Sequence, residues 1–275
     1  MSRLDVTTDS TSLDLRFGLA RVRAHWSLTL YPDAREASGS FQPSLRAARS
    51  GGGGSVERSS LEAGRRAQGK IRRYCAANGL NRLGTLTYAG EGCHDPEQLR
   101  ADVAAFFKEL RRTGFRGKGK VYLPLQHGAS EHGGMPYLWV PQWHPGGHGL
   151  HVHFAVGRYI NRSAIEESWG HGFVHIKLLG GLSTGSGWLE EARLAARYLS
   201  RYVGAQLDDE RRLPGLHRYE VAQTFQPREV KLRGRSPDEL IAQACEIIGG
   251  EPKRQWRSDQ SEAWHGPPAL WLQWD

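Results

Sequence analysis

Residues 149–156 read Gly-Leu-His-Val-His-Phe-Ala-Val and predict a β-strand. Alternate side chains of a strand share a face, so His151 and His153 point to one side. Leu150, Val152 and Phe154 point to the other side and are expected to pack against a hydrophobic layer. This stretch therefore predicts a strand with a packed back and two imidazole rings side by side on its front.

Strands and helices alternate on both sides of this strand, joined by short loops rich in Gly and Pro. The expected fold class is α+β, with a central sheet and flanking helices. Hydrophobic spacing and end signals predict helices over 59–78, 96–113, 163–169, 188–203 and 237–249. They predict further strands over 26–31, 83–88, 121–125, 137–140 and 173–178.

Composition divides the chain into three expected parts. Residues 1–68 are polar, basic and rich in Ser and Gly, and are expected to form a flexible N-terminal arm. Residues 69–205 are expected to form the folded domain. Residues 206–275 are expected to hold one helix and a tail that either docks on the domain or is poorly ordered. The tail carries Trp256, Trp264, Trp271 and Trp274.

The charge balance favours an anionic partner. Lys and Arg number 37 against 29 Asp and Glu, which gives a net charge of +8 and a sequence pI near 9.6. Nucleic acid is the commonest partner of so basic a chain. Three separated cysteines and no CxxC spacing indicate neither a disulfide framework nor a zinc ribbon. With no signal peptide or long apolar run in view, we expect a cytoplasmic protein without a membrane segment.

Two imidazoles side by side on a strand supply two of the three protein ligands of a metal site. The third ligand is expected from the preceding segment, where Gln142 offers an amide oxygen and His144 and His148 offer nitrogen. We favour His144 slightly. A histidine-triad nucleotide hydrolase needs a third alternating histidine, and this position is Ala155, which excludes that class.

A second motif lies on the helix expected over 188–203. Tyr198 and Tyr202 are four residues apart, so they lie one turn apart on one helix face. Arg197 and Arg201 stand beside them and favour both phenolate and phosphate. A phenol is a weak nucleophile unless its electrophile is polarised, and a metal on the histidine pair would supply that polarisation. The two motifs therefore predict one site, with Tyr198 marginally preferred as the first nucleophile.

With these motifs in this order, the sequence resembles the HUH endonucleases, and among them the rolling-circle replication initiators of bacterial plasmids and phages. Residues 83–88, Leu-Gly-Thr-Leu-Thr-Tyr, are similar to the first family motif. His151-Val-His153 matches the histidine–hydrophobic–histidine motif, and residues 198–202 are similar to the two-tyrosine motif. The resemblance covers about residues 70–205. It implies an RRM-like antiparallel palm with the histidines on a central strand, and DNA contacts at Thr85, Thr87, Arg197 and Arg201.

The resemblance further implies a tyrosine that attacks single-stranded origin DNA and leaves a 5′-phosphotyrosine and a free 3′-OH as primer. A divalent metal is implied, Mg or Mn by expectation, although nitrogen ligands also tolerate Zn. The sequence departs from the family at Gln142, where a carboxylate is frequent, and at Arg201, where lysine is usual. A relaxase or transposase of the same chemistry, and a non-catalytic DNA-binding regulator, stay open as alternatives.

One further segment resembles a nucleotide-binding motif but does not match it fully. Residues 114–120 have the GxxxxGK spacing of a phosphate loop, but Val121 follows where a Ser or Thr is needed. An ATPase is therefore excluded, and unwinding is expected to need a host helicase, with a host polymerase extending the primer. Lys118 and Lys120 are expected to touch the DNA backbone instead.

Overall fold

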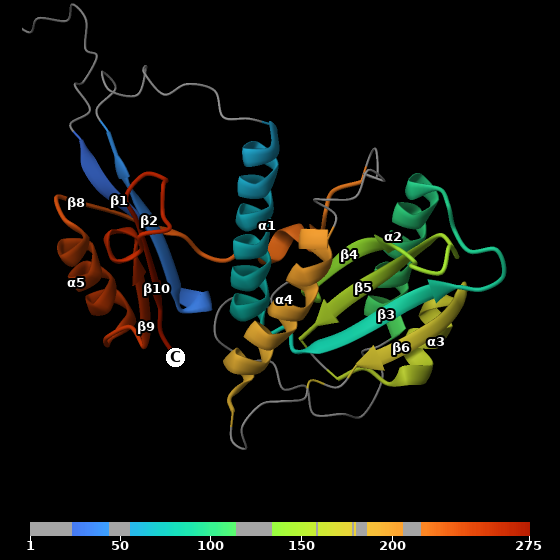
Figure 1. Ribbon diagram of the computed structural model, residues 1–275. Helices are drawn as coiled ribbons and strands as arrows, with labels where there is room; N and C mark the ends of the chain where they lie inside the picture. Colours follow the sequence, from blue (N-terminus) through green and yellow to red (C-terminus); the bar gives the residue numbers. More distant parts are fainter. Residues whose placement is uncertain are drawn as a thin grey trace, which may run out of the picture.

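Two antiparallel sheets, separated by a pair of helices, make up the computed structural model (Figure 1). The structure describes residues 24–43, 56–113, 134–157, 159–177, 179, 186–205 and 216–275. The sheet that contains residues 150–156, called the histidine sheet below, has the strand order β6-β3-β5-β4-β7. The other, called the terminal sheet, has the order β8-β1-β2-β10-β9. The expected α+β class with antiparallel sheet and flanking helices is confirmed.

The histidine sheet and its helices follow the expected elements closely. Its central strand β5 spans Leu150–Val156 and lies between β3 and β4. The other strands are β3 (Arg82–Tyr88), β4 (Tyr137–Trp143), β6 (Gly172–Lys177) and β7 (Glu220–Val221). The helices are α1 (Val56–Asn78), α2 (Pro96–Thr113), α3 (Arg162–Trp169) and α4 (Trp188–Ala205). The strand expected over 121–125 lies outside the described residues.

The two faces of the histidine sheet bury different sets of side chains. Behind β5, Leu150, Val152 and Phe154 pack against the apolar faces of α2 and α3, as expected from the alternation. Gly84 on β3 is required here, because a Cβ at this position would lie 2.3 Å from the Phe154 ring. On the front, α1 and α4 cover Ala155 and its neighbours, and both histidines are buried as well.

The terminal sheet differs from the expected arm and tail. Strands β1 (His25–Tyr31) and β2 (Glu36–Gln42) pair with each other and with segments about two hundred positions later in the chain. Those partners are β8 (Val230–Gly234) and β10 (Ala269–Gln273), and β10 pairs in turn with β9 (Arg254–Arg257). Helix α5 (Pro237–Ile248) covers this sheet. Residues 24–43 are therefore sheet strands, and the tail docks by strand pairing and by the buried Trp274.

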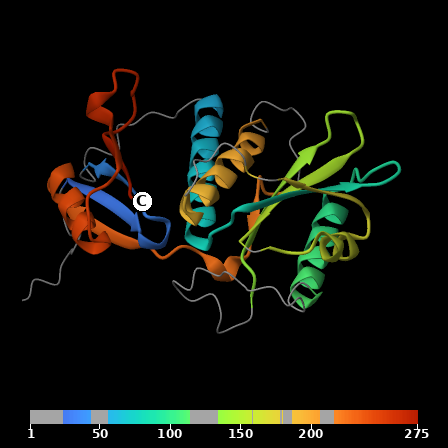
Figure 2. The same cartoon turned by 90° about the horizontal axis from the view of Figure 1, so that it is seen from below.

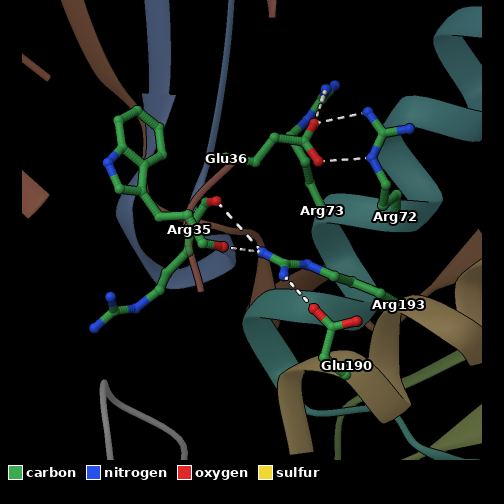
Figure 3. A network of polar contacts seen from close by, with 7 residues as sticks. Arg35, Glu36, Arg72, Arg73, Glu190 and Arg193 are labelled. Carbon is green, nitrogen blue, oxygen red and sulfur yellow. Dashed lines mark hydrogen bonds and ion pairs between the residues drawn. The ribbon is translucent and has the colours of Figure 1, made fainter. Parts of the chain in front are cut away.

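Helices α1 and α4 lie between the two sheets and join them (Figure 2). The contacts that join the helices to the terminal sheet include ion pairs and hydrogen bonds of buried side chains. Glu36, with only 2% of its surface exposed, accepts hydrogen bonds from Arg72 at 2.6 and 2.8 Å and from Arg73 at 3.3 Å (Figure 3). Arg193 on α4 donates to the backbone oxygens of Arg35 and Trp274, at 3.5 and 2.6 Å. These contacts fix the terminal sheet against both helices.

Replacing Glu36 with alanine is expected to lower the free energy of unfolding by about 2–3 kcal/mol. Removal of one partner from a fully buried pair costs ~3–5 kcal/mol, and the partial exposure of Arg72 reduces that cost. Urea denaturation measures the difference. Glu166→Ala is the control, because its pair with Arg162 is exposed on both sides and is worth less than ~1 kcal/mol. Equal stability losses in the two variants would contradict an ionic joint.

Candidate active site

The strand register brings the predicted histidines and Gln142 into two adjacent rows on one face of the histidine sheet. Gln142 on β4 pairs with His151 on β5, and Thr87 on β3 lies on the other side of His151. One row further along, His153 lies opposite Thr85. Because neighbours in a row share a face, the side chains of these residues converge on the front of the sheet.

Three side-chain atoms meet at this point. Nε2 of His151 lies 3.0 Å from Nε2 of His153. Oε1 of Gln142 lies 3.2 Å from the first of these nitrogens and 2.9 Å from the second. A metal with ligand bonds of ~2.1 Å in octahedral geometry spaces adjacent ligands by about 3.0 Å. The three atoms therefore have the separations of one face of such a coordination shell.

No neutral arrangement of protons satisfies this triangle. Each ring nitrogen is either a donor or an acceptor, and so is the amide atom of Gln142, whichever way the amide is turned. With only two kinds of atom at three corners, at least one edge joins two donors or two acceptors. A cation removes this conflict, because all three atoms then present lone pairs to it. The residues present thus fit a divalent metal.

The protein keeps both rings neutral, as metal ligation requires. Burial, followed by the charge of His144, lowers the pKa of His151 to about 4. Burial, followed by the charge of His151, lowers the pKa of His153 to about 3. Nδ1 of His153 lies 3.0 Å from the Thr85 hydroxyl, which orients the ring with Nε2 towards the other two atoms. Thr85, expected to contact DNA, thus has a positioning contact within the site.

The structure brings Gln142 to the histidine pair and turns His144 away from it. Nδ1 of His144 accepts a hydrogen bond from the Gly146 amide at 3.0 Å, so in the neutral ring Nε2 carries the proton. The His144 ring meets His151 edge-on, with centroids 5.4 Å apart. His148 is exposed and contacts His144 alone among the rings of the site. The distances favour Gln142 as the third ligand, against the slight preference for His144.

Within the described ranges, no group of three or more His, Cys, Asp and Glu side chains is placed to hold a metal. The triangle formed by Gln142, His151 and His153 is not such a group, because one of its three members is an amide side chain. An amide oxygen is a neutral ligand, so a cation here would keep its full charge for a bound phosphate.

The two tyrosines lie directly against this triangle. The Tyr202 ring stacks on the His153 ring, with centroids 3.7 Å apart and planes 11° apart. The Tyr202 hydroxyl donates a hydrogen bond of 2.6 Å to the Tyr198 hydroxyl. Small buried residues on α4, Ala195 and Ala196, let the helix approach the sheet closely enough for this contact. The paired motifs of the sequence are therefore one cluster in space.

Comparison with known proteins relates this part of the chain to a replication family. A family model described as a replication-associated protein matches residues 81–207, which include both histidines and both tyrosines. The matched residues, 81–207, are called the replication-associated unit below. Searches of curated proteins and of solved structures gave no match.

In this replication-associated unit, the two hydroxyls have unequal roles. Burial, followed by the hydrogen bond that it donates to Tyr198, raises the pKa of Tyr202, while the charge of Arg201 opposes the rise. Tyr198 accepts that hydrogen bond. Nζ of Lys177 on β6 lies 4.6 Å from the centre of the Tyr198 ring. Sequence reasoning missed Lys177, since only the strand order places β6 beside this end of α4.

The remaining predicted residues of the replication-associated unit are more scattered. Arg197 and Arg201 are exposed and line a groove on the side of α4 that faces the terminal sheet. Thr87 on β3 lies between His151 on β5 and Phe173 on β6. Phe173 is an aromatic residue with 69% of its surface exposed. Lys118 and Lys120 lie outside the described residues. No helix in the described part of the chain is long and apolar enough to cross a membrane.

Proposed function

We propose that this chain initiates rolling-circle replication by nicking and rejoining single-stranded origin DNA through a tyrosine. The observation that carries the proposal is the Tyr202 ring stacked on His153, which joins the tyrosine pair to the triangle of metal-ligand atoms. The family match supports a role in replication. The nicking chemistry rests on the geometry of the site.

The side chains that would hold the metal are Gln142, His151 and His153. When bound there, a divalent cation supplies Lewis-acid polarisation of the scissile phosphate. Gln142 adds no charge, and both imidazoles are neutral. These ligands would therefore not neutralise the charge of the cation, which would stay available to attract the phosphate. Mg or Mn is the expected ion, since phosphate oxygens and an amide oxygen are hard ligands.

Tyr198 is the first nucleophile in this proposal. Its oxygen forms a bond to phosphorus as the bond from phosphorus to the 3′-oxygen breaks, and that oxygen leaves as a hydroxyl after taking up a proton. The Tyr198 proton passes to solvent, and the hydrogen bond donated by Tyr202 stabilises the phenolate. The products are a 5′-phosphotyrosine and a free 3′-OH primer.

Tyr202 is placed for the second transfer. While Tyr202 donates its proton to Tyr198, its own oxygen is held in the less reactive, protonated form. Once Tyr198 is esterified, its oxygen no longer carries negative charge, and the constraint on Tyr202 is weaker. An order of attack from Tyr198 to Tyr202 follows, which suits cleavage of a regenerated origin.

Metal binding itself tests the ligand assignment without any DNA. Electron paramagnetic resonance of Mn²⁺ counts the free ion and so gives the affinity of the full chain. Gln142→Ala is expected to weaken Mn²⁺ binding at least ~100-fold, since even loss of an outer partner of a ligand costs ~10–100-fold. His144→Ala is the matched control and is expected to bind as the wild type does.

The reverse result, with His144→Ala weak and Gln142→Ala normal, would assign the third ligand to His144. Wild-type protein that binds no divalent metal would remove the basis for metal-assisted nicking. A DNA-binding regulator without chemistry would then account for the chain better.

A further inference from the structure

A cationic groove runs between the replication-associated unit and the terminal sheet. It encloses about 440 Å³ and is walled by α1 and α4 on one side and by β9 and β10 on the other. Glu190 is the acidic side chain among its lining residues. Five arginines line it, namely Arg72, Arg193, Arg197, Arg201 and Arg254, together with Trp271.

Two of the five arginines hold the walls together. Arg193, with 6% of its surface exposed, is occupied by Glu190 and by the backbone oxygens of the joint. Arg72 binds Glu36, and its guanidinium lies over the Trp271 ring, 5.4 Å from the ring centre. As Figure 3 shows, the bonds of Arg72 to Glu36 and of Arg193 to Arg35 cross from the helices to the terminal sheet, so the protein itself holds the two walls of the groove together.

The other three arginines have no acidic partner. Arg197, Arg201 and Arg254 are exposed, and none forms an ion pair with any residue in the ranges that the structure describes. Like charges held along one groove repel each other, and an anionic ligand relieves that repulsion. Planar guanidinium groups bind phosphate oxygens with two parallel hydrogen bonds.

The groove and the two tyrosines lie on neighbouring flanks of α4. Arg197 precedes Tyr198 and Arg201 precedes Tyr202 on α4, so each cation is attached one residue from a phenol. Successive helical residues point about 100° apart. The tyrosines therefore face the histidine sheet while the arginines face the terminal sheet, on two flanks of the same helix. A strand whose scissile phosphate lies at the tyrosines reaches the groove by crossing α4.

We propose that this groove binds the phosphates of the single DNA strand that flanks the scissile phosphate, which makes the terminal sheet part of the DNA-binding surface. The inference rests on the proposed function. A volume of about 440 Å³ lies within the range of ~300–1,000 Å³ typical of pockets for small ligands. Arg254 is the decisive residue, because it comes from β9, outside the replication-associated unit.

The test measures DNA binding separately from nicking. Fluorescence anisotropy of a labelled oligothymidylate is followed in EDTA, with full-length protein that carries Tyr198→Phe. Each phosphate contact to a single strand contributes about 0.7 to the slope of log affinity against log salt. Arg254→Gln is therefore expected to reduce the slope by ~0.7 and the affinity at 0.1 M salt about five-fold. The triple variant with Arg197→Gln and Arg201→Gln is expected to reduce the slope by ~2.

Arg235→Gln is the matched control. Arg235 is exposed on the terminal-sheet side of the chain, beyond β8, and its replacement removes the same charge without touching the groove. Equal slope losses for Arg235→Gln and Arg254→Gln would overturn the proposal, as would an unchanged slope for the triple variant. A duplex that competes as well as the single strand would also overturn it. A different result would separate the two proposals. If the groove arginines contribute to DNA binding as expected but the protein that retains Tyr198 does not nick, the proposed function would be wrong and the groove proposal would stay valid.

Discussion

Tyr198→Phe is expected to abolish nicking of single-stranded origin DNA, with a loss of at least ~1,000-fold in rate. The substitution removes only the oxygen that would attack phosphorus, while the ring keeps its place near His153 and Lys177. The measurement is release of a labelled 3′-OH fragment from single-stranded fragments that tile the DNA around the gene, with Mn²⁺ present.

Tyr202→Phe is the matched comparison. It removes the hydrogen bond of 2.6 Å that Tyr198 accepts. A hydrogen bond of this kind is worth about 1 kcal/mol, so the first nick is expected to slow only about five-fold. The transfer that needs a second tyrosine is expected to stop. Nicking that survives Tyr198→Phe and vanishes in Tyr202→Phe would reverse the assignment of the two tyrosines.

His153→Ala is expected to lower the nicking rate about 1,000-fold, because it removes both a proposed metal ligand and the ring on which Tyr202 stacks. His153→Phe tests the same position with a ring that can still stack on Tyr202 and that offers no ligand atom. His265→Ala, at an exposed position outside the histidine sheet, is expected to nick at the wild-type rate. Thermal unfolding of each variant separates a lost fold from a lost ligand.

Near-normal nicking by His153→Phe with an intact fold would contradict a metal on this pair. A loss shared by His265→Ala would point to a general effect on the protein rather than to the site. The Mn²⁺ measurement on Gln142→Ala and the rate measurement on His153→Ala then address different corners of the same triangle.

The local parts of the fold were predictable from the sequence. Strand β5 follows from the alternation of residues 150–156, and helix α4 follows from its hydrophobic spacing. Both elements carry their own signal, since each buries a face that is periodic in sequence. The convergence of histidines and tyrosines was predicted from their chemistry alone, and the stacked rings of Tyr202 and His153 show that they lie together.

The terminal sheet was not predictable in the same way. Strand β2 reads Glu-Ala-Ser-Gly-Ser-Phe-Gln, which has few of the β-branched and aromatic residues that mark a strand. Its stability comes from pairing with β1 and β10, and β10 lies more than two hundred positions away. A polar, glycine-rich segment resembles a flexible arm until its distant partner strands are known.

The choice between Gln142 and His144 depended on strand register. Gln142 lies directly opposite His151, whereas His144 follows the last residue of β4 and turns back to the Gly146 amide. The sequence suggests both side chains as ligands, and only the pairing of β4 with β5 separates them. The same holds for Arg197 and Arg201, whose groove has a second wall from the terminal sheet.

The most direct test is to find which residue carries DNA after the reaction. Wild-type protein is incubated with the cleavable single strand and Mn²⁺, digested with nuclease and trypsin, and analysed by mass spectrometry. Trypsin cuts after Arg197 and Arg201, so the two tyrosines fall in different peptides. The account predicts a nucleotide joined through its 5′-phosphate to the peptide 198–201. Recovery of both peptides unmodified, from a reaction supplied with any divalent metal, would contradict it.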